Sequence, residues 1–155
     1  MIGEVVELTV EARPTAIIAE TTTWQEFPQL WSALLGEVWG ALRGDERVRP
    51  GRNVMLYLDD VPHVEIGVEA AGAFEPVGRI RPSVLPAGRV AMTRLVGSYD
   101  EIGAAHHAVV QACAARGLER LGPRWEIYGH HDDASPDQEV EVYHLVRAAQ
   151  SSSGA

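Results

Sequence analysis

The apolar positions of the chain follow two different periods in its first half. TAIIA at 15–19 is an apolar run of strand length, and in 24–44 the apolar residues recur every three to four positions. The second spacing predicts an amphipathic helix. Two stretches of strand character follow, at 53–60 and 64–69. The first half therefore predicts the order strand, helix, strand, strand.

The second half repeats this order. RVAMTRL at 89–95 predicts a strand, and 98–117 predicts a helix whose apolar stripe is thinner and rich in alanine. Strands at 124–133 and 140–146 complete the second unit. Two copies of one structural unit are thus expected within a single chain.

The two copies align residue by residue in their central strands. An offset of 71 places Tyr57 on Tyr128. At 155 residues the chain has the length of one compact domain rather than two. The expected organisation is a single domain over 1–147, with copies at about 5–70 and 89–147, a glycine- and proline-rich connector at 71–88 and a flexible tail at 148–155.

Both predicted helices carry start signals. Ser98 with Glu101 forms a capping box, and Thr23 with Glu26 resembles one. Pro28 has no amide hydrogen and fits only the first turn of a helix. The first helix is therefore expected to begin either at the Thr23 cap or near Phe27.

Composition and charge exclude several classes of function. The formal net charge of −9 disfavours phosphate backbones and anionic membranes, so we expect no direct nucleic-acid or membrane partner. All 13 basic residues are arginine, which excludes lysine Schiff-base chemistry. Cys113 is the single cysteine, which excludes an intrachain disulfide and fits a reducing cytoplasm. The first ten residues carry acids and no basic n-region, and no apolar run approaches the roughly 20 residues that a membrane span needs, so a cytoplasmic protein without a targeting segment is expected.

One carboxylate is expected on an aromatic surface. Strand alternation places Glu126 and Tyr128 on the same face, and the offset of 71 adds Met55 and Tyr57 if the two copies meet about a twofold axis. A carboxylate among such side chains is costly to ionise, so it should hold a proton or await a cation. The simpler alternative is a carboxylate at a solvated rim.

The histidines and Cys113 suggest neither a metal site nor a nucleophile. HHDD at 130–133 clusters possible ligands, but its aspartate pair recurs without histidines at 59–60, which indicates turn chemistry. His106 and His107 point about 100° apart on a helix and cannot chelate one ion together. Cys113 lies mid-helix among alanines. Neither a nucleophile elbow nor a phosphate loop is present, and we expect no metal and no cofactor.

Four segments together resemble a known family. LPAGRVA at 85–91, GSYDEI at 97–102, WEIY at 125–128 and EVYHLV at 141–146 resemble the GyrI-like small-molecule-binding domain, the effector-binding domain of bacterial multidrug-sensing transcription activators. The resemblance implies an α+β fold in which two pseudo-twofold-related strand–helix–strand–strand units form an antiparallel sheet with two long helices and a central groove. Such activators carry a helix-turn-helix segment beside this domain. Here the two copies use up the chain, so DNA binding is not expected.

The resemblance also implies a set of site residues. The family's pocket centres on a glutamate that Glu126 matches, and it has aromatic residues where this chain has Tyr99 and Tyr143. Trp39 and His106 could reach the groove from the two helices. The candidate ligand-binding residues are Glu126, Tyr128, Tyr143, Tyr99, Tyr57, Met55, Trp39 and His106.

Three functions remain open from the sequence. The first is a stand-alone binder of hydrophobic, often cationic small molecules, acting by sequestration or sensing. The second is hydrolysis of strained or electrophilic small molecules, as in some GyrI-like proteins, with Glu126 as general base and Tyr143 or Tyr128 as proton donor. The third is inhibition of a protein partner, which the scattered acidic residues favour least. The sequence names no such partner.

Overall fold

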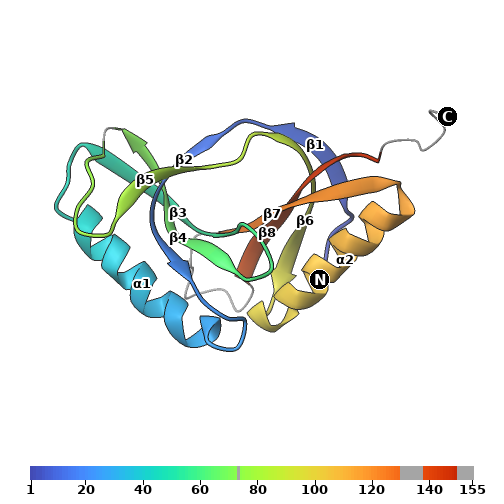
Figure 1. Ribbon diagram of the computed structural model, residues 1–155, viewed down its shortest axis with the longest axis horizontal. Helices are drawn as coiled ribbons and strands as arrows, with labels where there is room; N and C mark the ends of the chain where they lie inside the picture. The colour runs from blue at the N-terminus through green and yellow to red at the C-terminus, as the bar shows by residue number, and fades with distance from the viewer. Residues whose placement is uncertain (73, 130–137, 150–155) are drawn as a thin grey trace.

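The computed structural model describes residues 1–72, 74–129 and 138–149 and places eight strands and two α-helices in them (Figure 1). In chain order the elements are β1 (Val6–Val10), β2 (Arg13–Thr21), α1 (Phe27–Leu42), β3 (Val48–Tyr57), β4 (His63–Gly72), β5 (Arg81–Leu85), β6 (Gly88–Gly97), the 3₁₀ turn η1 (Tyr99–Glu101), α2 (Ile102–Ala115), β7 (Leu118–Tyr128) and β8 (Gln138–Ala148).

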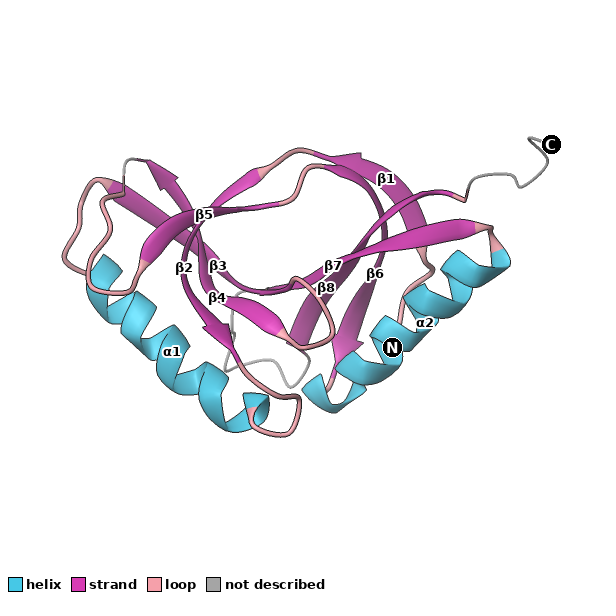
Figure 2. Cartoon of the chain, viewed as in Figure 1, coloured by secondary structure: helices cyan, strands magenta, loops and turns pink. Residues whose placement is uncertain are grey.

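The strands form one antiparallel sheet in the order β1-β6-β8-β7-β3-β4-β2-β5. Each strand of the first half has its repeat counterpart at the mirrored place in this order, so the sheet has a pseudo-twofold axis between β7 and β3. Both helices lie on one face of the sheet and form a V whose narrow end brings their amino-terminal ends together (Figures 1 and 2). The predicted α+β fold of two related units is confirmed.

The pairing of β3 with β7 fixes the position of the axis. Met55 lies opposite Glu126 in this ladder, and Leu56 lies opposite Trp125. Met55 and Glu126 are also equivalent in the repeat, because they are separated by the offset of 71. The pseudo-twofold axis therefore passes through this pair, and the side chains of Met55 and Glu126 share the helix-covered face.

The two edge strands were not predicted. β1 pairs with β6 of the second copy, and β5, within the expected connector 71–88, pairs with β2 of the first copy. Each is a five-residue strand, and β5 contains Pro82, which lacks a backbone donor and is tolerated at a sheet edge. β1, which precedes β2, thus completes the second copy, and β5, which precedes β6, completes the first.

The predicted start signals of both helices form capping hydrogen bonds. Ser98 accepts a hydrogen bond from the Asp100 amide, and Glu101 accepts one from the Ser98 amide, which confirms the capping box. The Thr23 hydroxyl accepts from the Glu26 amide at 3.1 Å. The helix α1 itself begins at Phe27, with Pro28 in its first turn.

Within the described ranges, the buried apolar side chains form three clusters. One lies under α1 and one under α2, while the third covers the opposite face of the sheet. The first cluster includes Leu34 and Val38 of α1, and the second includes Val109 of α2. In the third, Trp125 stacks on Tyr143 with ring centroids 5.5 Å apart.

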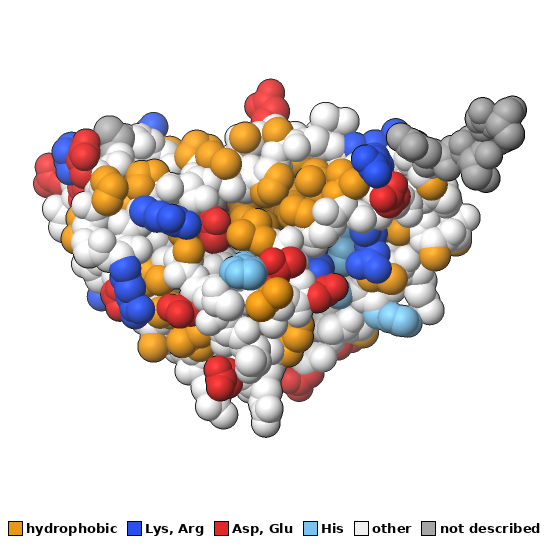
Figure 3. All heavy atoms as spheres, in the orientation of Figure 1, with side chains coloured by type: hydrophobic (Ala, Val, Ile, Leu, Met, Phe, Trp, Pro, Cys, Tyr) orange, Lys and Arg blue, Asp and Glu red, His pale blue; other side chains and the backbone are white. Residues whose placement is uncertain are grey.

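Charged side chains of both signs alternate over the face shown in Figure 3. Arg52 bridges Glu69 at 3.0 Å and Glu141 at 3.2 Å, and Arg13 also contacts Glu69. These arginines are therefore neutralised locally.

None of the helices in the described ranges is long and apolar enough to cross a membrane.

A pair of glycine substitutions tests the sheet packing. A Cβ at Gly67 would collide with the backbone carbonyl of Ala16 in β2, whereas a Cβ at Gly36 in α1 would meet no atom within 4 Å. We expect Gly67→Ala to lower the free energy of unfolding by about 2 kcal/mol or more. Gly36→Ala should raise it by up to about 1 kcal/mol. Urea unfolding measures both, and a neutral Gly67→Ala would contradict the close pairing of β2 with β4.

Candidate functional site

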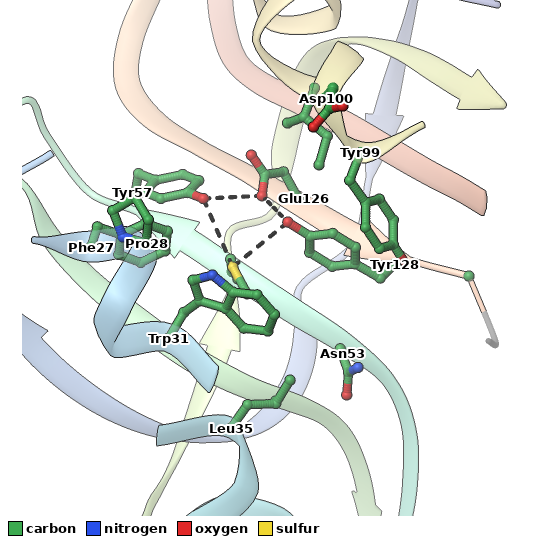
Figure 4. Close-up of a pocket in the computed structure, with 13 residues that line it drawn as sticks. Phe27, Pro28, Trp31, Leu35, Asn53, Tyr57, Tyr99, Asp100, Glu126 and Tyr128 are labelled. Carbon is green, nitrogen blue, oxygen red and sulfur yellow. Dashed lines mark hydrogen bonds between the residues drawn. The ribbon is translucent and has the colours of Figure 1, made fainter. Parts of the chain in front are cut away.

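A groove of about 670 Å³ lies between the amino-terminal ends of the two helices and over the central strands β3 and β7 (Figure 4). This volume is within the usual range for small-molecule sites. The residues that line it are Phe27, Pro28, Trp31, Leu35, Asn53, Met55, Tyr57, Tyr99, Asp100, Ile102, Glu126, Tyr128 and Gly129.

Glu126 lies at the floor of this groove and is only 3% exposed. Its Oε1 accepts a hydrogen bond from the Tyr57 hydroxyl at 3.0 Å and another from the Tyr128 hydroxyl (Figure 4). Tyr57 and Tyr128 are repeat counterparts, so the pseudo-twofold axis brings their hydroxyls to one carboxylate oxygen. The repeat therefore builds a groove floor with a single carboxylate at its centre.

The second carboxylate oxygen is held by a histidine. His106 Nε2 lies 2.7 Å from Glu126 Oε2, and His106 Nδ1 lies 2.9 Å from His144 Nε2. Because an ionised carboxylate only accepts hydrogen bonds, His106 Nε2 must donate to it. His144 is 2% exposed. Glu126, His106 and His144 thus form a hydrogen-bonded chain from the groove floor into the core beneath α2.

Met55 completes the floor on the axis. Its sulfur lies 3.6 Å from the Tyr128 hydroxyl and 3.9 Å from the Tyr57 hydroxyl. Where the repeat places a carboxylate in one copy, it places a soft thioether in the other. The floor is therefore apolar except for Glu126 and its hydrogen-bond partners.

Burial controls the protonation of the surrounding groups. It raises the pKa of Tyr57 and Tyr128 well above that of a free tyrosine, and the negative charge of Glu126 raises both further. Both hydroxyls consequently remain donors. Burial, with a smaller contribution from His106, lowers the pKa of His144 to about 3, so His144 is neutral near pH 7.

Aromatic side chains from both copies form the walls. Trp31 and Phe27 come from α1, and Tyr99 comes from the turn before α2. Tyr99 meets Tyr128 edge to face at 5.7 Å, and Phe27 meets Tyr57 in the same way at 5.5 Å. A planar apolar ligand would meet ring faces and edges on both sides.

The structure places five of the predicted site residues in the groove lining: Met55, Tyr57, Tyr99, Glu126 and Tyr128. Trp39 and His106 lie behind the lining instead. The Trp39 indole donates to the Asn53 side chain at 2.8 Å, so it positions a lining residue. His106 reaches Glu126 from the α2 side of the groove.

The expectation that Tyr143 lines the groove is wrong. Tyr143 lies opposite Trp125 in the β7–β8 ladder, and Val142 lies opposite Glu126. Because side chains alternate along a strand, Tyr143 points to the other face of the sheet, where it stacks on Trp125. Its hydroxyl donates to Glu141 at 3.0 Å. Tyr143 therefore cannot protonate a ligand held over Glu126.

The sequence analysis did not include Trp31, Asn53 or His144 among the site residues. Trp31 is on the apolar stripe of α1, but the stripe is wider than the surface that the sheet covers, so its edge faces the groove. No local sequence pattern marks His144, since its role depends on the pairing of β8.

The HHDD segment at 130–133 lies outside the described residues. The described residues contain no cluster of three histidine, cysteine or acidic side chains able to hold a metal ion.

The comparison with protein families decides the relationship. The profile of the GyrI-like small molecule binding domain matches residues 3–147. The chain belongs to this family. No protein of curated function matches this GyrI-like chain.

Solved structures share the GyrI-like fold at low sequence identity. The EcmrR C-terminal domain superposes with a TM-score of 0.78 at 15% identity, over 96% of this chain and all of the other. SAV2435 bound to tetraphenylphosphonium gives 0.68 at 16% identity, over 93% of this chain and 94% of the other. A hydrolase encoded by lin2189 from Listeria innocua gives 0.60 at 10% identity, over 93% and 92%. These likenesses support the fold alone.

The neutral buried His144 predicts a pH dependence of stability. The unfolded chain binds a proton at this residue near pH 6.5, while the folded chain does not until about pH 3. Stability must therefore fall as the pH drops below about 6.5, by about 2 kcal/mol between pH 7 and pH 5 from this residue. His144→Gln should remove this part of the slope, as measured by urea unfolding at several pH values. Equal slopes in both proteins would contradict the assignment.

Proposed function

We propose that the groove binds hydrophobic, singly charged cations, with Glu126 as the counter-charge, and that the protein acts by sequestering or sensing such molecules. One observation carries the proposal: a nearly fully buried carboxylate lies at the floor of an open groove whose walls are aromatic. In this low-dielectric setting a cation gains more from the carboxylate than a neutral molecule does. Ring faces add cation–π attraction.

The neighbouring structures agree with this class of ligand. SAV2435 shares the fold and was solved with tetraphenylphosphonium, a lipophilic cation. The family description is that of a small-molecule-binding domain. We assign ligand contact to five side chains that line the groove: Met55, Tyr57, Tyr99, Glu126 and Tyr128.

The proposed partners follow from charge, and the proposed location follows from the cysteine. A net charge of −9 and locally paired arginines favour small cations over nucleic acids as partners. We retain the cytoplasm as the proposed location, because the single cysteine Cys113 is free and buried.

The affinities of two ligands of matched shape and opposite charge test the proposal. Tetraphenylphosphonium and tetraphenylborate have similar shape and opposite charge. We expect micromolar binding of the cation and binding of the anion that is at least about tenfold weaker. Glu126→Gln should remove this preference, since it keeps the shape of the side chain and deletes its charge. Fluorescence titration or calorimetry measures all four affinities.

Tyr143→Phe is the matched control for this experiment. It removes a hydroxyl on the opposite face of the sheet, so its affinities should equal those of the wild type. Equal affinities of the wild type for the cation and the anion would overturn the role of Glu126.

Hydrolysis is the second candidate, because the groove combines a carboxylate with a protonated tyrosine hydroxyl that can donate a hydrogen bond. Glu126 could take a proton from water while Tyr128, hydrogen-bonded to the same carboxylate, protonates the leaving atom. The hydrolase encoded by lin2189 from Listeria innocua has a similar fold, which supports hydrolysis as a candidate. The corrected placement makes Tyr128, and not Tyr143, the proton donor of this proposal.

Turnover separates an enzyme from a binder. An enzyme should convert many equivalents of an epoxide, another strained-ring compound or an activated ester, and Glu126→Gln or Tyr128→Phe should each lower the rate by roughly 100-fold. Tyr143→Phe should leave the rate unchanged. Product that never exceeds one equivalent per protein molecule over hours would eliminate hydrolysis of the compounds tested.

A further inference from the structure

The carboxylate of Glu126 divides its two oxygens between the groove and the core. Oε1 meets the hydroxyls of Tyr57 and Tyr128, while Oε2 meets His106. We propose that His106 determines the charge specificity of the groove: a proton on His106 and a ligand cation compete for Glu126, so that binding a cation releases up to one proton. This inference rests on the proposed function and names the regulation of its site.

The two charge states of the Glu126–His106 pair differ by one proton. With a neutral imidazole the pair has a net charge of −1, and with an imidazolium it has none. The side chains of Glu126 and His106 are 4% and 18% exposed, so water screens their interaction weakly. A cation in the groove therefore meets either an unbalanced carboxylate or an already neutralised ion pair.

His144 allows His106 to exist in both states. When His106 is neutral, its Nε2–H donates to Glu126, and its Nδ1 accepts from the Nε2–H of His144. When His106 is protonated, its Nδ1–H donates to the unprotonated Nε2 of the other His144 tautomer. Because the pKa of His144 is lowered to about 3, His144 changes tautomer without becoming charged near pH 7. Both states thus keep the buried nitrogens of this contact hydrogen-bonded.

In the described part of the chain, the groove lining contains one further acid besides Glu126, Asp100 in the turn before α2. Tyr57 on β3 meets the His106 ring at 6.4 Å, and burial raises the pKa of Tyr57 and Tyr128 away from neutrality. Arg124 and Arg120 on β7 are permanent cations whose charges act on His144. On β6 the buried residues of this face are Ala91, Thr93 and Leu95, which do not titrate near neutral pH. His107, the neighbour on α2, is exposed.

A proton on His106 should therefore select the ligand class. Histidine is the side chain whose ordinary charge change lies between about pH 5 and pH 8. Cations should bind best at the upper end of this range, where the pair is negative. Neutral molecules of similar shape should bind with little pH dependence, because neither state of the pair offers them a full charge.

Calorimetry with tetraphenylphosphonium tests the proton competition. Affinity should fall as the pH is lowered from 8 to 6, with a slope approaching about tenfold per pH unit where one proton is released per cation. The binding heat in buffers of different ionisation enthalpy counts that proton. His106→Gln keeps a donor toward Glu126 but cannot take up a proton, so its affinity should not depend on pH. His107→Gln should behave as the wild type does.

The outcomes separate this inference from the proposed function. Binding of the cation without pH dependence and without proton release would overturn the competition and leave the function intact. Absence of tetraphenylphosphonium binding by the wild type at either pH would overturn the proposed function. In that case NMR titration of the His106 ring in the free protein decides the coupling: Glu126→Gln must change the pH at which the ring titrates, and an unchanged titration would refute it. The same NMR readout applies if His106→Gln does not fold.

Discussion

The antiparallel pairing of β3 with β7 is the constraint on which the rest of the site depends. It places Met55 opposite Glu126, and because these two residues are repeat equivalents, the pseudo-twofold axis passes through them. Tyr57 and Tyr128 then approach the same point from the two sides. A shift of the register by one residue would turn these side chains to the opposite face. The groove is thus a direct consequence of how two copies of one unit meet.

The axis also explains why the floor of the groove has one carboxylate. Two equivalent carboxylates at this point would repel each other at close range, whereas Met55 in one copy leaves Glu126 with a soft neighbour. Burial of a carboxylate is tolerated only when its oxygens have partners. Tyr57 and Tyr128 serve one oxygen and His106 serves the other. The site therefore holds a charge that is hydrogen-bonded but not permanently neutralised.

Short-range patterns in the sequence were enough to predict the units and the central face. Period and repeat offset predicted both helices and placed Met55, Tyr57, Glu126 and Tyr128 together, because these depend on local alternation and on symmetry. The prediction that Tyr143 lines the groove was wrong, because the face on which its side chain lies depends on how β8 pairs with β7. Alternation within β8 alone does not determine that face. The partnership of His106 with His144 was missed for the same reason, since it joins α2 to β8 across the core. The edge strands β1 and β5 also depend on pairing between copies.

A structure determined with tetraphenylphosphonium tests the central claim most directly. The cation should occupy the groove between the amino-terminal ends of α1 and α2, with its charged centre nearest to Glu126 and its rings against Tyr99, Tyr128 and Trp31. Glu126 should keep its contact with His106. A cation bound on the opposite face of the sheet, or in the groove but turned away from Glu126, would refute the role of Glu126 as its counter-charge.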